Sequence, residues 1–246
     1  MQVTVNRLKF VEEFLTPIQL VSDAAIISIK KGFVDCLAYS MEPQTILYCK
    51  NTIATGFEDD TQINLNFPSI RKFSSALRRI SDDYVTLKIG SNNISMGNAD
   101  GTIHFKYHLL DDGIIQIPPI KIEKLHEMEF DFETDMSQEA IESLVQNSFF
   151  SENSRIVNLY TKDGKVYCEI GDSDGLSDSV DMLFSETFTG NHIKPKMSFD
   201  FETFRKFFNL KRDNMHLKIN TQRGLLLFEL SKGDFKMEII TTAQSK

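Results

Sequence analysis

Basic side chains gather in two short stretches of this sequence, where they occur as adjacent pairs. The pairs are Arg71-Lys72 and Arg78-Arg79 in the first stretch, and Arg205-Lys206 and Lys211-Arg212 in the second. Guanidinium and ammonium groups neutralise phosphates, so such clusters are typical of surfaces that bind a polyanion. The formal net charge is −8, which makes the rest of the chain acidic. This segregation suits a polyanion that is held on one face and repelled from the others.

A solvated helix face is the simpler explanation of a basic stretch, and for one stretch alone it would be preferred. A repeat in the sequence weighs against it. Residues 67–73 read Phe-x-x-Ile-Arg-Lys-Phe, and residues 201–207 read Phe-x-x-Phe-Arg-Lys-Phe. A strand-like segment follows each of them, at 84–89 and 215–219. The sequence therefore predicts an internal duplication with one basic helix in each copy.

No catalytic or metal-binding motif accompanies the basic clusters. His104 and His108 lie in a predicted strand, where four residues span about 13 Å and cannot share one ion. The loop at 171–178 resembles a calcium loop, but it lacks the third ligand position and the final glutamate. Glu139 and Glu142 lie on a predicted surface with nothing to raise a pKa. We therefore predict no catalytic residue, no metal and no cofactor.

The hydrophobic pattern predicts an α+β protein with two similar domains, each with two helices packed on antiparallel sheets. The 246 residues suffice for two domains of ordinary size. Helical spacing of apolar residues predicts helices at 6–15, 66–80, 137–149 and 200–212, with strands between them. Pro17 is expected to end the first helix. We expect domain 1 at 1–112, an interdomain connector at 113–125 and domain 2 at 126–246.

The connector is unusually apolar, and we expect it to form neither a strand nor a helix. Its isoleucines are Ile114, Ile115, Ile117, Ile120 and Ile122. Pro118 and Pro119 interrupt any strand. An apolar segment must be covered, either by packing on the domains or by a partner that fills a groove beside it.

Cysteine usage and the N-terminal residues indicate an intracellular protein without a membrane segment. Cys36, Cys49 and Cys168 are scattered and form no C-x-x-C pair. No signal-peptide core follows Met1, and no apolar run is long enough to span a membrane.

Together these features resemble the DNA sliding clamps, of which proliferating cell nuclear antigen and the tailed-phage clamps are the two-domain members. The order helix, strands, helix, strands is duplicated around a central connector, as in that family. Residues 63–73 resemble the family's strand-into-helix segment, and residues 38–42 resemble its small-x-Ser/Ala-Met-Asp turn. Residues 114–124 lie where the interdomain connector would be. The resemblance thus implies the DNA-clamp fold.

The resemblance also implies a function. Two-domain clamps are homotrimers, so six domains would form a closed ring around double-stranded DNA, which is contacted without sequence specificity. The chain would be a processivity factor without catalysis of its own, with DNA polymerase and a clamp loader ATPase as partners. It would act inside the cell at replication sites, in the host cytoplasm if it comes from a phage.

Three surfaces follow from the resemblance. The DNA-facing residues would be Arg71, Lys72, Arg78, Arg79, Arg205, Lys206, Lys211 and Arg212, with Arg7 and Lys9 as weaker candidates. The partner-peptide pocket would be lined by Met41, Ile46, Ile114, Ile115, Ile117, Ile120, Ile239 and Ile240, of which Ile46, Ile239 and Ile240 could instead be ordinary core residues. Subunits would meet through the strand edges at 102–110 and 177–186, with Ile103, Phe105, Tyr107, Val180, Met182 and Phe184 as contacts. The acidic helix at 137–149 departs from the family's basic pattern.

Two other interpretations remain open. A viral processivity factor could grip DNA directly without forming a ring. A duplicated β-rich enzyme or ligand-binding protein could carry basic helices that are merely solvated. The mass in solution separates the ring from both.

Overall fold

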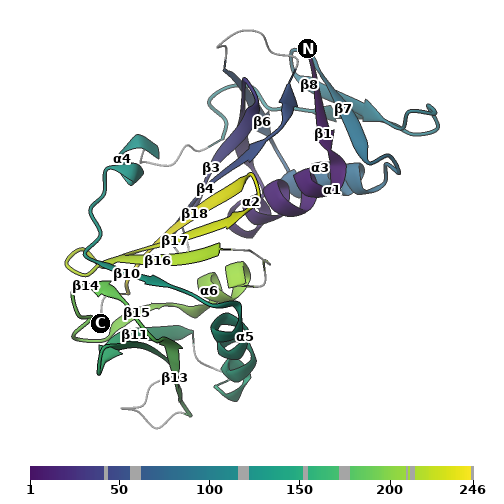
Figure 1. Ribbon diagram of the computed structural model, residues 1–246. Helices are drawn as coiled ribbons and strands as arrows, with labels where there is room; N and C mark the ends of the chain where they lie inside the picture. The colour runs from purple at the N-terminus through teal and green to yellow at the C-terminus, as the bar shows by residue number, and fades with distance from the viewer. Residues whose placement is uncertain are drawn as a thin grey trace. The chain divides into compact units, whose positions relative to one another are not determined.

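The computed structural model describes residues 1–41, 44–55, 62–115, 122–151, 155–171, 178–208, 210 and 214–244. The chain forms two compact units (Figure 1). Unit 1 comprises residues 1–40, 46–122 and 233–237, and unit 2 comprises residues 41–45, 123–232 and 238–246.

The first half of the chain contributes two sets of strands. One follows the order β5-β1-β7-β8-β9 and the other the order β4-β3-β2-β6. The bounds are β1 Gln2–Asn6, β2 Ala25–Lys30, β3 Phe33–Met41, β4 Gln44–Thr52, β5 Ala54–Thr55, β6 Ile63–Phe67, β7 Tyr84–Ile89, β8 Asn93–Gly97 and β9 His104–His108. Every second residue of β2 is buried, which is the alternation expected of a strand with one face on a core. The short strand β1 was not anticipated from the sequence.

The second half repeats this arrangement strand by strand. Its orders are β14-β10-β16-β17-β18 and β13-β12-β11-β15. The bounds are β10 Phe132–Asp135, β11 Ile156–Lys162, β12 Lys165–Ile170, β13 Val180–Ser185, β14 Thr189–Gly190, β15 Met197–Asp200, β16 Asn214–Asn220, β17 Leu225–Lys232 and β18 Phe235–Thr242. Each strand holds the place in its order that its counterpart holds in the first half. The predicted duplication and the α+β class are therefore confirmed.

Two helical segments accompany the strands in each half. In the first half they are a continuous segment, made of α1 Arg7–Lys9, the π-helical turn η1 Phe10–Leu15 and α2 Thr16–Val21, and the basic helix α3 Ile70–Arg78. In the second half they are α5 Gln138–Asn147, which runs into the 3-10 turn Ser148–Phe150, and α6 Phe201–Phe208. Apart from a short helix at the end of the predicted connector, the described residues thus contain the two helical segments predicted for each half. None of the helices there is long and apolar enough to cross a membrane.

Two local predictions were wrong. Pro17 does not end the first helix. The wide π turn closes with a hydrogen bond from Thr16 N to Val11 O, so Pro17 falls at the start of the next helical turn, where its missing N–H costs little. The end of the connector is also helical, as α4 Ile122–His126, because good helix formers follow the two prolines there.

Candidate nucleic-acid interface

Helix α3 separates its apolar and basic residues onto opposite faces. Ile70, Phe73 and Leu77 are each 0% exposed and form the predicted apolar stripe. The basic side chains of the helix and of its C-cap are exposed: Arg71, Lys72, Arg78 and Arg79. Burial of the stripe fixes the rotation of the helix, so the four cations are directed to solvent.

The N-terminus of α3 is held by residues from outside the helix. Ser69 is the N-cap, and its hydroxyl oxygen accepts a hydrogen bond from Lys72 N at 3.1 Å. Asp23 accepts from Arg71 N at 2.8 Å and from the Ser69 hydroxyl at 2.8 Å. A carboxylate at this end also interacts favourably with the helix dipole. Asp23 was missed from the sequence, because nothing local marks a cap 46 residues away.

Tyr107 of strand β9 completes this anchor. Its hydroxyl donates to Ser69 O at 2.7 Å and accepts from Ser69 N at 2.9 Å, and its ring packs between Phe67 and Phe73. Burial raises the pKa of the Tyr107 hydroxyl, against the hydrogen bond to Ser69, and the charge of Asp23 adds to the rise. With 5% exposure Tyr107 is a core residue. The side chain is thus used within its own unit, and its role as a subunit contact stays a prediction.

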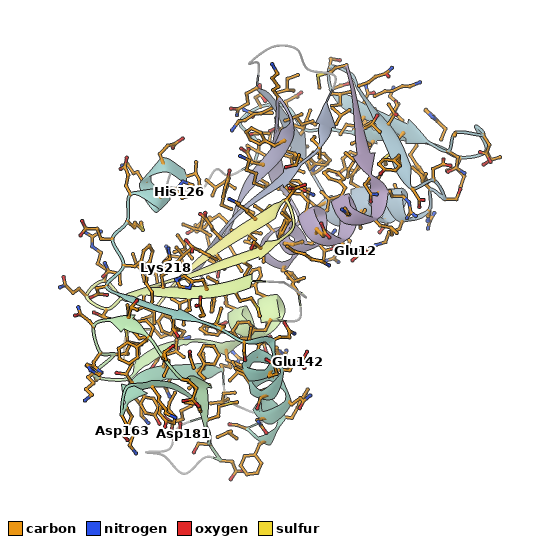
Figure 2. All side chains as sticks on the ribbon, in the orientation of Figure 1. Glu12, His126, Glu142, Asp163, Asp181 and Lys218 are labelled. Atoms are coloured by element: carbon orange, nitrogen blue, oxygen red, sulfur yellow. The ribbon has the colours of Figure 1, made fainter. Side chains whose placement is uncertain are left out.

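The cations on α3 differ in their surroundings. Arg78 Nη2 lies 3.1 Å from Glu12 Oε1 and 3.4 Å from the Thr16 hydroxyl oxygen. Figure 2 shows Glu12 on the helical segment at 7–21, which packs against α3. Among the residues described, the other three cations of α3 and its C-cap have no ion-pair partner. These three are directly available to an anion.

Helix α6 also combines a buried apolar face with basic residues, but fewer of its predicted cations lie within the described residues. Asp200 caps it by accepting from Thr203 N at 2.8 Å, and Phe204 and Phe207 are buried below it. Arg205 is half-buried and its Nη2 lies 2.8 Å from Glu202 Oε1. Lys206 is exposed. Lys211 and Arg212, also predicted to bind DNA, lie outside the described residues.

Arg7 and Lys9, the weaker DNA-binding candidates, have different environments. Arg7 Nε donates to Asp82 O at 2.8 Å, and its half-buried side chain fastens the start of α1 to the loop before β7. Lys9 is exposed. Arg7 thus has a structural role that a count of cations does not reveal.

The two predicted subunit edges lie at the ends of strand orders. β9 is last in its sheet, and so is β13. Ile103, Phe105, Val180 and Met182 are half-buried, as expected of side chains beside a free edge. Phe184 is only 2% exposed, so its side chain packs within its own unit, as that of Tyr107 does.

An exposed aromatic pair was missed from the sequence. Phe149 is 68% exposed and Phe150 is 63% exposed, directly after α5. Helix α5 packs against the edge strand β13, and Leu183 of that strand is 38% exposed. No local signal marked this pair, since the consecutive Phe207 and Phe208 at the end of α6 are both buried.

The predicted pocket residues fall into three groups. Met41 and Ile114 are 68% and 59% exposed, whereas Ile46 and Ile115 are half-buried. Ile239 and Ile240 are 0% and 5% exposed, so they are core residues and the alternative considered for them holds. Ile117 and Ile120 lie outside the described residues.

Titratable side chains in the described part of the chain form no group of three or more that could hold a metal ion. Cys36, Cys49 and Cys168 are buried thiols, and burial raises the pKa of the Cys168 thiol, with the charge of Asp181 adding to the rise. The prominent chemical feature is therefore the pair of exposed basic helices.

The duplicated strand order, with two helical segments in each half, is the DNA-clamp fold. The chain is similar to A. fulgidus PCNA, in a structure with the C-terminal region of FEN-1 bound, at a TM-score of 0.78 and 16% identity over 100% of this chain and 98% of that one. It is also similar to PCNA from Thermococcus kodakaraensis, at a TM-score of 0.75 and 12% identity over 99% of both chains. A putative DNA polymerase III beta subunit from Eubacterium rectale gives a TM-score of 0.76 and 11% identity over 100% of this chain and 66% of that one. Compared by sequence, the chain matches no family model and no curated protein.

Proposed function

We propose that this protein is a sliding clamp, a processivity factor that encircles duplex DNA and tethers the replicative DNA polymerase. The observation that carries the proposal is the exposed basic face of α3, repeated by α6 at the equivalent place in the second half of a DNA-clamp fold. Lysine and arginine side chains that contact phosphates, and not bases, bind DNA of any sequence. A protein that slides along DNA requires such contacts. The protein would have no catalysis of its own.

Ring closure would use the free edges of β9 and β13. Each is the last strand of its sheet, and an unpaired edge favours pairing with another chain. Because the two edges belong to different sheets, a contact between them is head-to-tail, and such contacts form a ring when the rotation between neighbouring subunits closes. We propose a homotrimer, with 1–112 and 126–246 as the clamp domains and 113–125 as the connector.

Phe149 and Phe150 support this assembly. They lie at the end of the helix that packs on β13, and exposed aromatic residues are typical of interface centres. The acidic character of α5 then suits a contact with the next subunit better than a contact with DNA. Its Glu139 is exposed and would repel phosphate.

Partner binding would centre on the connector. Ile114 is an exposed isoleucine, and Met41 is an exposed methionine of the kind found at adaptable binding surfaces. DNA polymerase and a clamp loader ATPase would insert short apolar segments there. The protein would act inside the cell at replication sites.

Charge reversal on α3 tests the proposal. We expect the double variant Arg71→Glu and Lys72→Glu to lose retention on circular DNA while keeping its oligomeric mass, because both cations are exposed and neither supports the fold. The matched control carries Lys162→Glu and Lys236→Glu, which are equally exposed but lie on strands. Retention that survives in the α3 variant, or that is lost equally in the control, would contradict the assignment of this face.

A further inference from the structure

In each half of the chain, one arginine of the basic helix is held by a carboxylate of the same unit. Arg78 is paired with Glu12 at 3.1 Å, and Arg205 is paired with Glu202 at 2.8 Å. We propose that Glu12 and Glu202 are built-in competitors of DNA phosphate, which weaken the grip of the basic helices so that the protein can move along the duplex. This inference rests on the proposed function.

The first competitor comes from a neighbouring helix. Glu12 lies in the π-helical turn η1, which packs against α3, and Arg78 lies in the last turn of α3. The Thr16 hydroxyl, which donates to Val11 O at 2.9 Å, presents its oxygen to the same guanidinium at 3.4 Å. The side chains of Arg78 and Glu12 are 47% and 55% exposed. A phosphate can therefore reach Arg78 and displace the carboxylate.

The second competitor comes from the same helix as its arginine. Glu202 lies in the first turn of α6, where the helix dipole favours a carboxylate, and Arg205 follows one turn later. Both oxygens of Glu202 lie within 2.9 Å of Arg205 Nη2. Both side chains are 44% exposed, so this pair is also open to an incoming anion.

The two pairs are not copies of one ancestral contact. In the sequence repeat Glu202 corresponds to Pro68, and Arg205 corresponds to Arg71 rather than to Arg78. The same arrangement, a partly exposed arginine beside a partly exposed carboxylate, is thus reached by different residues in each half. Each basic helix thus has one arginine beside a carboxylate of its own unit.

The strength of these pairs suits competition. Exposed ion pairs contribute little to stability, so DNA can break them, but each remaining carboxylate still repels the phosphate that replaces it. Removing one carboxylate frees one cation, and we expect affinity for duplex DNA to rise about 2–5-fold per site. The slope of log affinity against log salt should steepen by up to about 0.9 for each cation freed.

Fluorescence anisotropy with a short linear duplex, which can enter a ring through its ends, measures both quantities over a salt series. The variants are Glu12→Gln, Glu202→Gln and the double variant, which keep the size of each side chain. Asp111→Asn and Glu127→Gln are matched controls, because they remove the same charge from exposed residues that belong to neither basic helix. The control variants should bind as the wild type does.

A double-mutant cycle with Arg78→Gln separates competition from net charge. If Glu12 acts through Arg78, then Glu12→Gln raises affinity in the wild type but not in the Arg78→Gln background. Unchanged or weaker binding by Glu12→Gln and Glu202→Gln, or an equal gain in the controls, would overturn the inference. If Arg71→Glu with Lys72→Glu still weakens binding in that case, the proposed function stands, and if it has no effect, the proposed function itself fails.

Discussion

At the scale of single residues, the partners of a cation decide what it can bind. Arg7 and Arg79 look alike in the sequence, yet Arg7 donates to Asp82 O, whereas Arg79 is exposed at the C-cap of α3. The spacing of basic residues in the sequence therefore predicted the basic surface, but it could not show which of its cations are available to an anion. That availability depends on contacts with residues far away in the chain.

Tyr107 offers a test of how α3 is held in place. We predict that Tyr107→Phe lowers the free energy of unfolding by about 1–3 kcal/mol, because Ser69 N loses its buried hydrogen-bond partner while the ring packing is kept. Urea denaturation measures the change. Tyr84→Phe is the control, since Tyr84 is 68% exposed and should tolerate the change. Equal stability of Tyr107→Phe and wild type would contradict the anchoring role.

Asp131 gives a prediction for pH dependence. Burial raises the pKa of Asp131, but hydrogen bonds from Thr221 and Asn191 outweigh this and leave the pKa below its ordinary value of 3.8. Because the folded pKa is lowered, the carboxylate stabilises the fold above pH 3.8, and this contribution is lost as the pH falls through the folded pKa. We predict that Asp131→Asn is less stable than wild type at neutral pH and that the difference narrows in acid. Denaturant titrations over a pH series would contradict this if the difference stayed constant.

At the scale of elements, local pattern predicted the helices well and their ends poorly. The apolar stripe of Ile70, Phe73 and Leu77 could be predicted because its buried residues recur at helical spacing. The continuation of the first helix through Pro17 was not predicted, because a π turn does not follow from a simple periodicity in the sequence. The cap supplied by Asp23 depends on tertiary contact, which spacing does not reveal.

The turn after α5 is predicted to be an assembly element. Replacing Phe149 and Phe150 by serine should raise the dissociation constant of the oligomer without lowering the stability of the subunit, because both rings are exposed in the single chain. Sedimentation velocity over a concentration series measures the first effect and denaturant unfolding of the dissociated chain the second. Leu8→Ser, at a residue that is 51% exposed on α1, is the control. An unchanged dissociation constant would exclude this surface from the interface.

At the scale of the whole molecule, duplication carried the prediction of the fold. The repeat of the motif at 67–73 as Phe-x-x-Phe-Arg-Lys-Phe at 201–207 implied two similar halves, and the strand orders repeat as expected. Ring closure could not be derived from the sequence, since it depends on contacts between chains.

The most direct test of the central claim is the mass of the wild-type protein by sedimentation equilibrium. The proposed ring predicts a species of three times 28.2 kDa, because β9 of each subunit would pair with β13 of the next until the ring closes. Its population should grow with protein concentration and reach no larger closed species. A single species of 28.2 kDa at every concentration would contradict the ring, and with it the topological tether to DNA.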